Sequence, residues 1–299
     1  MPNTINYATQ FMADIMQKYS RELLTADLTT QNVTFLNANT IKIPFLSVGG
    51  YKNHSRAGGF NSQDVVKKDM IKTLSFDRDV ELFVDTMDVD ESNQAVSAAN
   101  VTNVFITEHG IPETDAYRIS KLYADFIAEG EDNPAGVADK TVITKENVLS
   151  IFDGYMTAMD EAEVPEEGRI LYVTPAISDM IKNAVGVSRN LNVGNAADSA
   201  INRAINALDN VKIVKMPSGR MKTAYNFEDG YVPAVGAKQI NMVLVHPRSV
   251  IACDKHSYIR LWPEGTHTKG DGWLYQNRKY GDLFVVNNRK DGIKINIEA

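Results

Sequence analysis

The stretch SVGGYKNHSRAGGFNSQD, residues 47–64, is glycine-rich, polar and weighted toward positive charge. It lies between NTIKIPFLSV (residues 39–48) and MIKTLSFDRDVELFVD (residues 70–85), two segments in which apolar and polar residues alternate. Such alternation predicts β-strands with one apolar face, and two of them in succession predict an antiparallel pair. A hairpin normally needs only about 2–5 turn residues, so we expect this connection to serve more than chain reversal.

The predicted pair of strands needs a cover, because two strands alone are marginally stable in water. Pro44 has no backbone N–H to donate, which places the first strand at the edge of a sheet. If the glycine-rich tip projects beyond its domain, another chain must cover the apolar face. The alternative is a disordered surface loop over residues 47–64, which composition alone favours.

The overall composition is that of a folded protein without strong affinity for nucleic acid. The chain has 299 residues, 43% of them hydrophobic and 23% charged, and a net charge of −7. No segment is basic over any length, which argues against tight binding to DNA, RNA or anionic lipid. The single cysteine, Cys253, cannot form an internal disulfide, and the sequence shows neither a secretory signal nor a membrane span.

After the predicted hairpin, the sequence predicts first a long helix and then helices that alternate with short strands. The apolar spacing predicts a long helix over residues 91–128, interrupted at a His-Gly pair and restarted by Pro112. Residues 130–138 have the composition of a linker. Residues 139–246 alternate helices with short strands, which predicts one layered α/β domain.

Four local features refine this α+β outline. Thr144 and Thr174 are predicted to cap the N-termini of two helices. The segment INRAINALDNVKIVKMP (residues 201–217) predicts a helical turn followed by a strand. Near the end of the chain, an Asp-Gly turn signal at residues 291–292 separates two apolar segments and predicts a C-terminal hairpin.

No constellation of residues predicts catalysis, a metal site or a cofactor. The sequence lacks a phosphate-binding glycine loop and a nucleophile elbow. Three polar sets have simpler interpretations: a buried thiol near a surface histidine, a helix-capping acidic run, and a solvated helix end. These sets are, in that order, Cys253 with His256; Asp85, Asp88 and Asp90; and Glu161, Glu163, Glu166 and Glu167.

Six strings of residues, taken in order, carry a resemblance over most of the chain. They are IPFLSVGGYKNHSRAGGF (43–60), LSFDRDVELFVD (74–85), IPETDAYRISKLYADF (111–126), VKIVKMPSGRMKT (211–223), MVLVHPRSVIACDKHSYIRLWPEG (242–265) and RKYGDLFVVNNRKDGI (278–293). With them, the chain resembles the major capsid proteins of tailed bacteriophages, which have the Hong Kong 97 bacteriophage fold. It is similar to those of phages of Gram-positive bacteria. No single string is a strict motif, so their number and order carry the resemblance.

The resemblance implies an α+β, Hong Kong 97-like capsid fold in four parts. These are an N-terminal arm (1–38), an extended β-hairpin loop that lies over a neighbouring subunit (39–85), a peripheral domain with a spine helix (86–138 and 247–299) and an α/β axial domain (139–246).

The resemblance also implies a function, which is self-assembly into the pentamers and hexamers of an icosahedral head that encloses double-stranded DNA. No enzymatic activity and no cofactor are expected. The expected partners are copies of the chain, a portal, a decoration protein and a separate scaffolding protein, the last because only a short arm follows Met1. The negative net charge suits a container that contacts packaged DNA weakly. The expected location is the virion, after assembly in the host cytoplasm and without a membrane.

The residues of the extended loop expected to contact a neighbouring subunit are Lys52, His54, Arg56 and Phe60. Some relatives weld subunits through an isopeptide bond between a loop lysine and an asparagine, which here would join Lys52 to Asn287 or Asn288 in a C-terminal strand. That reaction needs a neutral lysine in a dry pocket and a glutamate base, and the sequence shows neither. We therefore expect Lys52 to form an exposed ion pair and the asparagines to serve the hairpin turn.

Two other functions stay open at this point. An encapsulin-type compartment shell has the same fold and would form small uniform shells without a scaffold. An α/β enzyme built on residues 139–246 would require a pocket with perturbed titratable groups.

Overall fold

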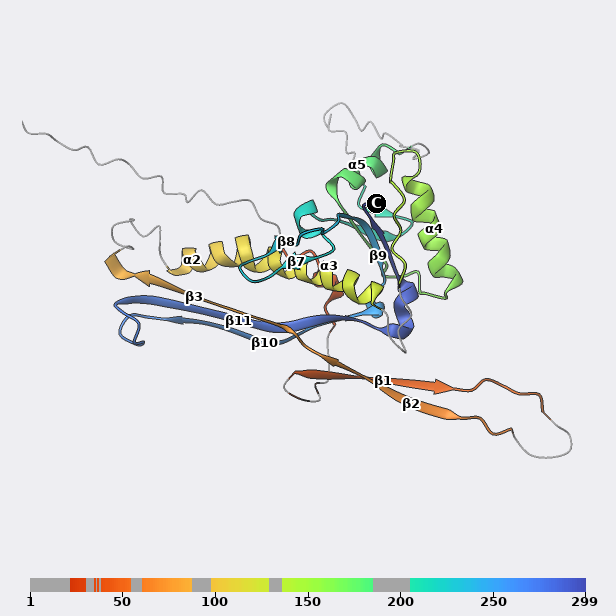
Figure 1. Ribbon diagram of the computed structural model, residues 1–299, viewed down its shortest axis with the longest axis horizontal. Helices are drawn as coiled ribbons and strands as arrows, with labels where there is room; N and C mark the ends of the chain where they lie inside the picture. Colours follow the sequence, from red (N-terminus) through yellow and green to blue (C-terminus); the bar gives the residue numbers. More distant parts are fainter. Residues whose placement is uncertain are drawn as a thin grey trace, which may run out of the picture.

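The computed structural model describes residues 22–30, 35, 37, 39–54, 61–87, 98–128, 136–184 and 205–299. Within them, strands form a five-stranded sheet, a three-stranded sheet and two two-stranded hairpins. Helices pack on both larger sheets, and one long hairpin projects from this body (Figure 1). The mixture of helix and strand confirms the predicted α+β class. Among the described helices, none has the length and apolar character needed to cross a bilayer.

The projecting hairpin consists of strands β1 (Thr40–Val48) and β2 (Val65–Thr73), which pair antiparallel with Val48 opposite Val65. The glycine-rich stretch therefore connects two paired strands, as predicted, and Pro44 lies on an edge strand. The prediction of one continuous strand over residues 70–85 is wrong, because the chain changes sheets after β2.

Two residues make this change of sheet. The N–H of Leu74, a buried residue, donates to the carbonyl oxygen of Asn39 at 2.8 Å. Ser75 donates its N–H and its hydroxyl to Asp282, at 2.8 and 3.0 Å. The next strand, β3 (Phe76–Asp85), then pairs with β11. The bend preserves the period of two, so alternation alone could not reveal it.

The three-stranded sheet has the order β10-β11-β3, with both pairs antiparallel. Its two further strands are β10 (Val250–Trp262) and β11 (Gly272–Val285). The predicted long helix lies along this sheet, and its predicted interruption is confirmed as a π-helical turn, after which Pro112 occupies the first turn of the continuing helix. Its three parts are α2 (Ala98–Phe105), η2 (Ile106–Gly110) and α3 (Ile111–Ile127).

The five-stranded sheet has the order β12-β9-β4-β6-β5, in which only β4 and β6 are parallel. Helices α4 (Val148–Glu161) and α5 (Pro175–Lys182) cover one of its faces, and α3 packs on the other. The strands are β4 (Ile170–Val173), β5 (Ala207–Leu208), β6 (Val211–Lys215), β9 (Ile240–Val245) and β12 (Ile293–Ile297).

Short elements connect these layers. They are the 3-10 turns η1 (Ala26–Leu28), η3 (Ser218–Arg220), η4 (Pro247–Ser249) and η5 (Asn287–Gly292), and the small hairpin of β7 (Tyr225–Asn226) and β8 (Val232–Pro233).

The structure corrects three local predictions. The prediction of a C-terminal hairpin is wrong, because β12 pairs with β9 and therefore lies in the sheet built mainly by residues 139–246. Of the helical turn and strand predicted over residues 201–217, the strand is confirmed as β6, while residues 201–204 lie outside the described residues and strand β5 stands where the turn was expected to end. Thr144 does not cap α4, whose N-cap residue is Asn147. Thr174 does cap α5, since its hydroxyl accepts from the N–H of Ile177 at 3.5 Å.

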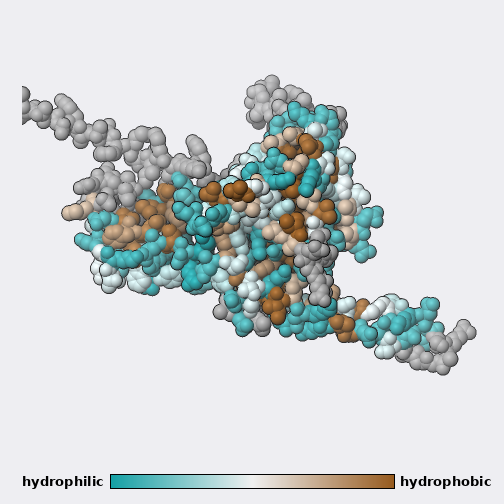
Figure 2. Space-filling view, viewed as in Figure 1, coloured by the Kyte–Doolittle hydropathy of each residue, from teal (hydrophilic) through white to brown (hydrophobic). Residues whose placement is uncertain are grey.

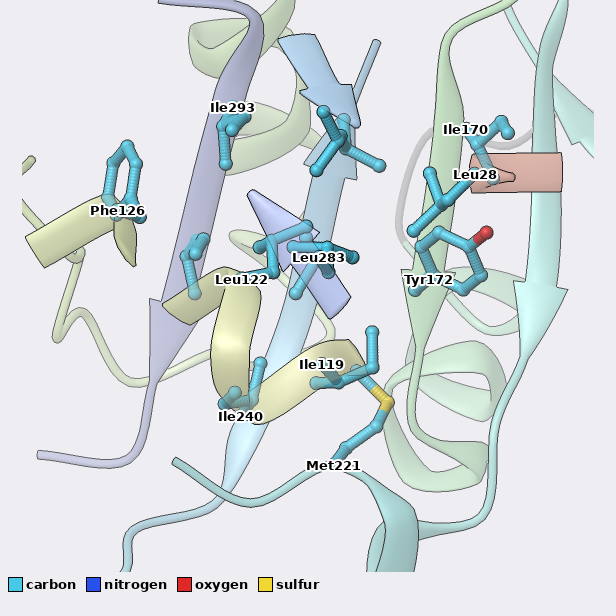
Figure 3. Packing of buried hydrophobic residues seen from close by; sticks show 14 of the residues in the cluster. Leu28, Ile119, Leu122, Phe126, Ile170, Tyr172, Met221, Ile240, Leu283 and Ile293 are labelled. Carbon is cyan, nitrogen blue, oxygen red and sulfur yellow. The ribbon is translucent and has the colours of Figure 1, made fainter. Parts of the chain in front are cut away.

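One buried cluster joins the two larger sheets through α3 (Figure 3). Ile119 and Leu122 of α3 lie in it together with Tyr172 of β4 and Leu283 of β11, all of them fully buried. A second buried cluster lies between α4, α5 and the opposite face of the five-stranded sheet. Successive residues of the central strands β4 and β9 point alternately into the two clusters, as expected for a sheet covered on both faces. The body is thus a packed unit, and the hairpin is the element that leaves it.

Candidate assembly interface at the projecting hairpin

The root of the hairpin is fixed to the body by apolar packing. Ile41 is fully buried and forms a cluster with Leu74, Cys253 and Phe284, against which Ile43 also packs. This cluster holds β1 at the point where it leaves the body, so the direction of the hairpin is set by its root.

Beyond the root, the hairpin exposes apolar side chains to solvent. Leu46, Val48 and Val65 are 61%, 62% and 64% exposed, although each is a residue type that favours burial. Figure 2 shows apolar and hydrophilic surface interspersed along this element. Contiguous exposed apolar residues on a marginal two-stranded sheet mark an interaction surface.

The hairpin also has a charge opposite to that of the rest of the chain. Residues 40–73 contain six Lys or Arg and two Asp, a net charge of +4, which leaves −11 on the other residues when the total is −7. One cross-strand ion pair, between Lys42 and Asp69 at 2.7 Å, neutralises a small part of it. Charge of this pattern favours contact between the hairpin of one copy and the body of another.

Two of the four predicted contact residues lie in the described part of the tip. Lys52 and His54 are exposed there, whereas Arg56 and Phe60 lie outside the described residues. Hydrogen bonds of Gln63 and Asn61 to the carbonyl oxygens of Gly50 and Asn53 join the two sides of the tip. The described part of the tip is thus an exposed element at the end of the projecting hairpin.

The two asparagines considered for a covalent weld lie in a different setting from the predicted strand. Asn287 and Asn288 begin the 3-10 turn η5. They line a cleft of about 1040 Å³ between the inner side of the hairpin root and the body. Lys52 does not line this cleft, so the structure does not bring the proposed weld residues together within one chain.

The segment before the hairpin is held by a buried carboxylate that sequence reasoning missed. Asp115 of α3 has no solvent exposure, and its oxygens accept hydrogen bonds from the N–H groups of Leu24 and Thr25 at 3.2 and 3.0 Å. They also accept from the Thr25 hydroxyl at 2.8 Å and from the guanidinium of Arg220 at 3.0 Å. These hydrogen bonds to a charged carboxylate attach residues 24–25 firmly to helix α3.

Arg118, one helical turn along α3, completes this attachment. Its guanidinium donates to the carbonyl oxygen of Thr25 at 3.1 Å, to the Thr29 hydroxyl at 3.0 Å and to Asp254 of β10 at 3.2 Å. The i, i+3 spacing of Asp115 and Arg118 is the only sequence signal for this network, and it is common on helices.

A second buried carboxylate fixes the joint between β2 and β3. Asp282 of β11 accepts both bonds from Ser75 and a third, at 2.6 Å, from the hydroxyl of Tyr117 on α3. Burial and the adjacent carboxylate raise the pKa of Tyr117, so its hydroxyl remains the donor.

We expect Asp282→Ala to lower the free energy of unfolding by about 2 kcal/mol, because it removes the charged acceptor of two hydrogen bonds from the exposed Ser75 and of one from the half-buried Tyr117 hydroxyl. Urea-induced unfolding of the unassembled chain measures this change. Asp77→Ala, which removes an exposed ion pair with Arg278 on the same sheet, is the matched control and should cost under about 1 kcal/mol. Equal effects of the two substitutions would contradict the assigned role of Asp282.

The structure describes part of the three polar sets that were considered as catalytic or metal sites in the sequence. Cys253 is buried, which raises the pKa of its thiol, and His256 is exposed. The carboxylates at the end of α4 are all exposed. Asp85 accepts from the N–H of Met87, while Asp88 and Asp90 lie outside the described residues. The described residues contain no group of three or more potential metal ligands.

Comparison with known proteins gives a consistent result for the fold. A chain of the mature capsid of bacteriophage PhiM1 matches with a TM-score of 0.68 and 14% identity, covering 98% of this chain and 92% of that chain. A chain of the capsid of cyanophage P-SCSP1u matches with a TM-score of 0.66 and 13% identity, over 98% and 93%. A chain of Mycobacterium phage Che8 matches with a TM-score of 0.63 and 14% identity, over 98% of each chain. No protein-family model and no curated protein matches the sequence.

The fold is therefore that of a capsid protein. More narrowly, it is the fold of bacteriophage major capsid proteins, which confirms the predicted resemblance.

Proposed function

We propose that this chain is the major capsid protein of a tailed bacteriophage. It self-assembles into pentamers and hexamers of an icosahedral head that encloses double-stranded DNA. The observation that carries the proposal is the hairpin, which leaves a packed body with apolar side chains exposed and opposite charge to that body. Such an element gains its partners only when copies of the chain lie against one another.

Repetition makes weak contacts sufficient for this role. Each hairpin needs to contribute only modest affinity, because many identical contacts act together over a closed shell. The four parts inferred from the sequence then have distinct tasks, with two boundaries moved to the points where the chain changes sheets. They are an arm (1–38), the loop over a neighbour (39–75), the peripheral domain (76–138 with 247–292) and the axial domain (139–246 with 293–299). The tip residues Lys52, His54, Arg56 and Phe60 contact the neighbouring copy.

The role is structural and not enzymatic. The buried, high-pKa thiol of Cys253 and the exposed carboxylates after α4 do not form a nucleophile with a base. The partners are copies of the chain, a separate scaffolding protein, a portal and a decoration protein, and the location is the virion after assembly in the host cytoplasm. The acidic body contacts packaged DNA weakly.

Electron microscopy tests the proposal directly. The chain is purified alone and together with its candidate scaffolding protein, and each sample is examined by negative stain. Closed shells that form with the scaffold support a phage head. Uniform small shells formed by the chain alone, without DNA, would favour the encapsulin-type compartment instead. A monodisperse monomer at high concentration in both samples would remove the shell function.

Subunits of the assembled shell are expected to stay covalently separate. Lys52 is exposed in the chain, and a weld would require a neighbour to supply a dry pocket for its amine. Lys52→Ala should therefore leave the mobility of shell subunits on a denaturing gel unchanged. A ladder of covalent oligomers in the parent protein, lost in this variant, would instead establish a weld through Lys52.

A further inference from the structure

The chain crosses between the two larger sheets at two neighbouring turns. It leaves the five-stranded sheet from β9 through η4 into β10, and it returns from β11 through η5 into β12. These two crossings form a joint between the sheets, because hydrogen bonds connect them directly. The bonds run from the N–H of His246 to the carbonyl oxygen of Gly292 at 2.9 Å, from the N–H of Val286 to that of Ser249 at 2.9 Å, and from the guanidinium of Arg289 to that of Arg248 at 3.1 Å.

The two crossings are closely packed at this joint. Gly292 and Ser249 are both buried, and a Cβ atom added to Gly292 would lie 2.1 Å from the hydroxyl oxygen of Ser249. Nonbonded atoms do not approach so closely, so the backbones of η4 and η5 are in direct contact. A group that gains charge inside this joint is therefore poorly accommodated while the joint stays closed.

His246 holds the joint through both nitrogens of its imidazole ring. The residue is only 4% exposed. Its Nδ1 atom accepts a hydrogen bond from the N–H of Arg248 at 3.1 Å, so Nδ1 is without a proton. The proton of the neutral ring is therefore on Nε2, which donates to the carbonyl oxygen of Glu167 at 3.2 Å. The neutral ring thus connects η4 to the segment between α4 and β4.

The surroundings of the ring oppose its protonation. Burial, together with the positive charges of three arginines, holds the pKa of His246 below its usual value of 6.5. A proton on Nδ1 would also face another donor, because the N–H of Arg248 points at that atom. The two glutamates near the ring are exposed, so water screens their charge. The charged residues on the elements packed against the ring are Arg248 from η4, Arg289 from η5, and Glu166, Glu167 and Arg169 from the segment between α4 and β4.

We propose that His246 makes this joint acid-sensitive: protonation of its ring breaks the hydrogen bond from Arg248, releases η4 and loosens the link between the two sheets. The opened joint exposes the ring to water, where its pKa returns toward 6.5 and it binds a proton more readily. The stabilisation of the closed joint is therefore complete above about pH 6.5 and is lost progressively as the pH falls below that value. At pH 5.0 the opening equilibrium becomes up to about thirtyfold more favourable than at pH 7.5. The other four of the five histidines are exposed or half-buried, so we assign this response to His246.

His267 provides a matched control, because its ring forms the same two kinds of bond in the turn between β10 and β11. Its Nδ1 accepts from the N–H of Lys269 at 3.3 Å, and its Nε2 donates to the carbonyl oxygen of Gly272 at 2.9 Å. This ring is half-buried and its neighbours in the turn are exposed. His246→Asn and His267→Asn each keep an acceptor for the N–H two residues further on, because an asparagine side chain forms that bond in turns, and neither asparagine titrates.

Hydrogen exchange measures the opening of the joint in the unassembled parent chain and in both variants. Exchange is followed by mass spectrometry at pH 7.5 and 5.0, corrected for the intrinsic rate, in peptides that cover residues 246–250 and 284–293. We expect protection at pH 5.0 to fall by up to about thirtyfold in the parent and in His267→Asn, and by less than about threefold in His246→Asn.

An equal loss of protection in the parent and in His246→Asn, or no loss in the parent, overturns the proposal. If His246→Asn does not fold, NMR titration of the parent decides instead. The protonation of the His246 ring and the loss of the protected N–H of Arg248 must then follow one midpoint below pH 6.5. Separate midpoints, or a ring that titrates at or above pH 6.5, overturn the proposal. These measurements use the unassembled chain, so their outcome is independent of the proposed shell function.

Discussion

Replacing residues 50–63 with Asn-Gly leaves a folded monomer that no longer forms shells. Gly49 and Asp64 already face each other, with the N–H of Gly49 donating to the carbonyl oxygen of Asp64 at 3.2 Å. A two-residue turn of this sequence is well suited to close strands at that position. The replacement removes the tip of the hairpin together with Lys52, His54 and Arg56. A shell that depends on many copies of this contact loses it everywhere at once.

The monomer provides the internal control for this variant. The described residues within the replaced stretch are exposed apart from Gln63, which is half-buried, so the packed body should be unaffected. Circular dichroism and the urea midpoint of the monomer should match those of the parent. Light scattering and electron microscopy then report assembly. Shells of normal yield and size from the shortened chain would show that the tip does not bind a neighbour.

Periodicity predicted the elements that bury one face against a local partner. The alternation of Ile41 and Ile43 identified β1, and the apolar spacing around Ile119 identified the spine helix. The His-Gly interruption of that helix was also visible, because glycine and the following Pro112 both act on the backbone of their own segment. Features of this kind can be predicted from sequence, because the residues that cause them are neighbours in the chain.

Pairing between distant strands was not visible in the same way. The break at Ser75 depends on Asp282, which is remote in sequence, and nothing in the alternation of residues 70–85 marks it. The pairing of β12 with β9 likewise follows from the layer into which its isoleucines pack, whereas a local Asp-Gly signal suggested a hairpin. Both errors come from a local signal that tertiary contacts override.

The candidate interface was predicted in outline and missed in detail. The glycine-rich tip between strands indicated a projecting loop, but β2 was expected to begin near Met70. The pair Val65-Val66 breaks the alternation and hid five residues of the strand, although β-branched pairs are themselves a signal for strand. Both valines are exposed, and as neighbours in a strand they lie on opposite faces of the hairpin.

Asp115→Ala should lower the free energy of unfolding by about 3–5 kcal/mol. The carboxylate is fully buried and accepts from two backbone N–H groups, the Thr25 hydroxyl and Arg220. Its removal leaves a buried guanidinium without its carboxylate and takes away three of the hydrogen bonds that join residues 24–25 to α3, so that only those from Arg118 remain among the bonds described above. Urea-induced unfolding of the unassembled chain measures the loss.

Two comparison variants keep this prediction testable even if Asp115→Ala does not fold. Thr25→Val removes one hydroxyl from the same site and should cost only about 1–2 kcal/mol, which leaves a measurable native state. Asp27→Ala removes a carboxylate from the same segment that forms an exposed ion pair with Lys212, and it should cost under about 1 kcal/mol. The order of effects therefore follows burial and bond number. If Asp27→Ala were as damaging as Thr25→Val, the segment would be held by its surface ion pair, and Asp115 would lose the role of anchor.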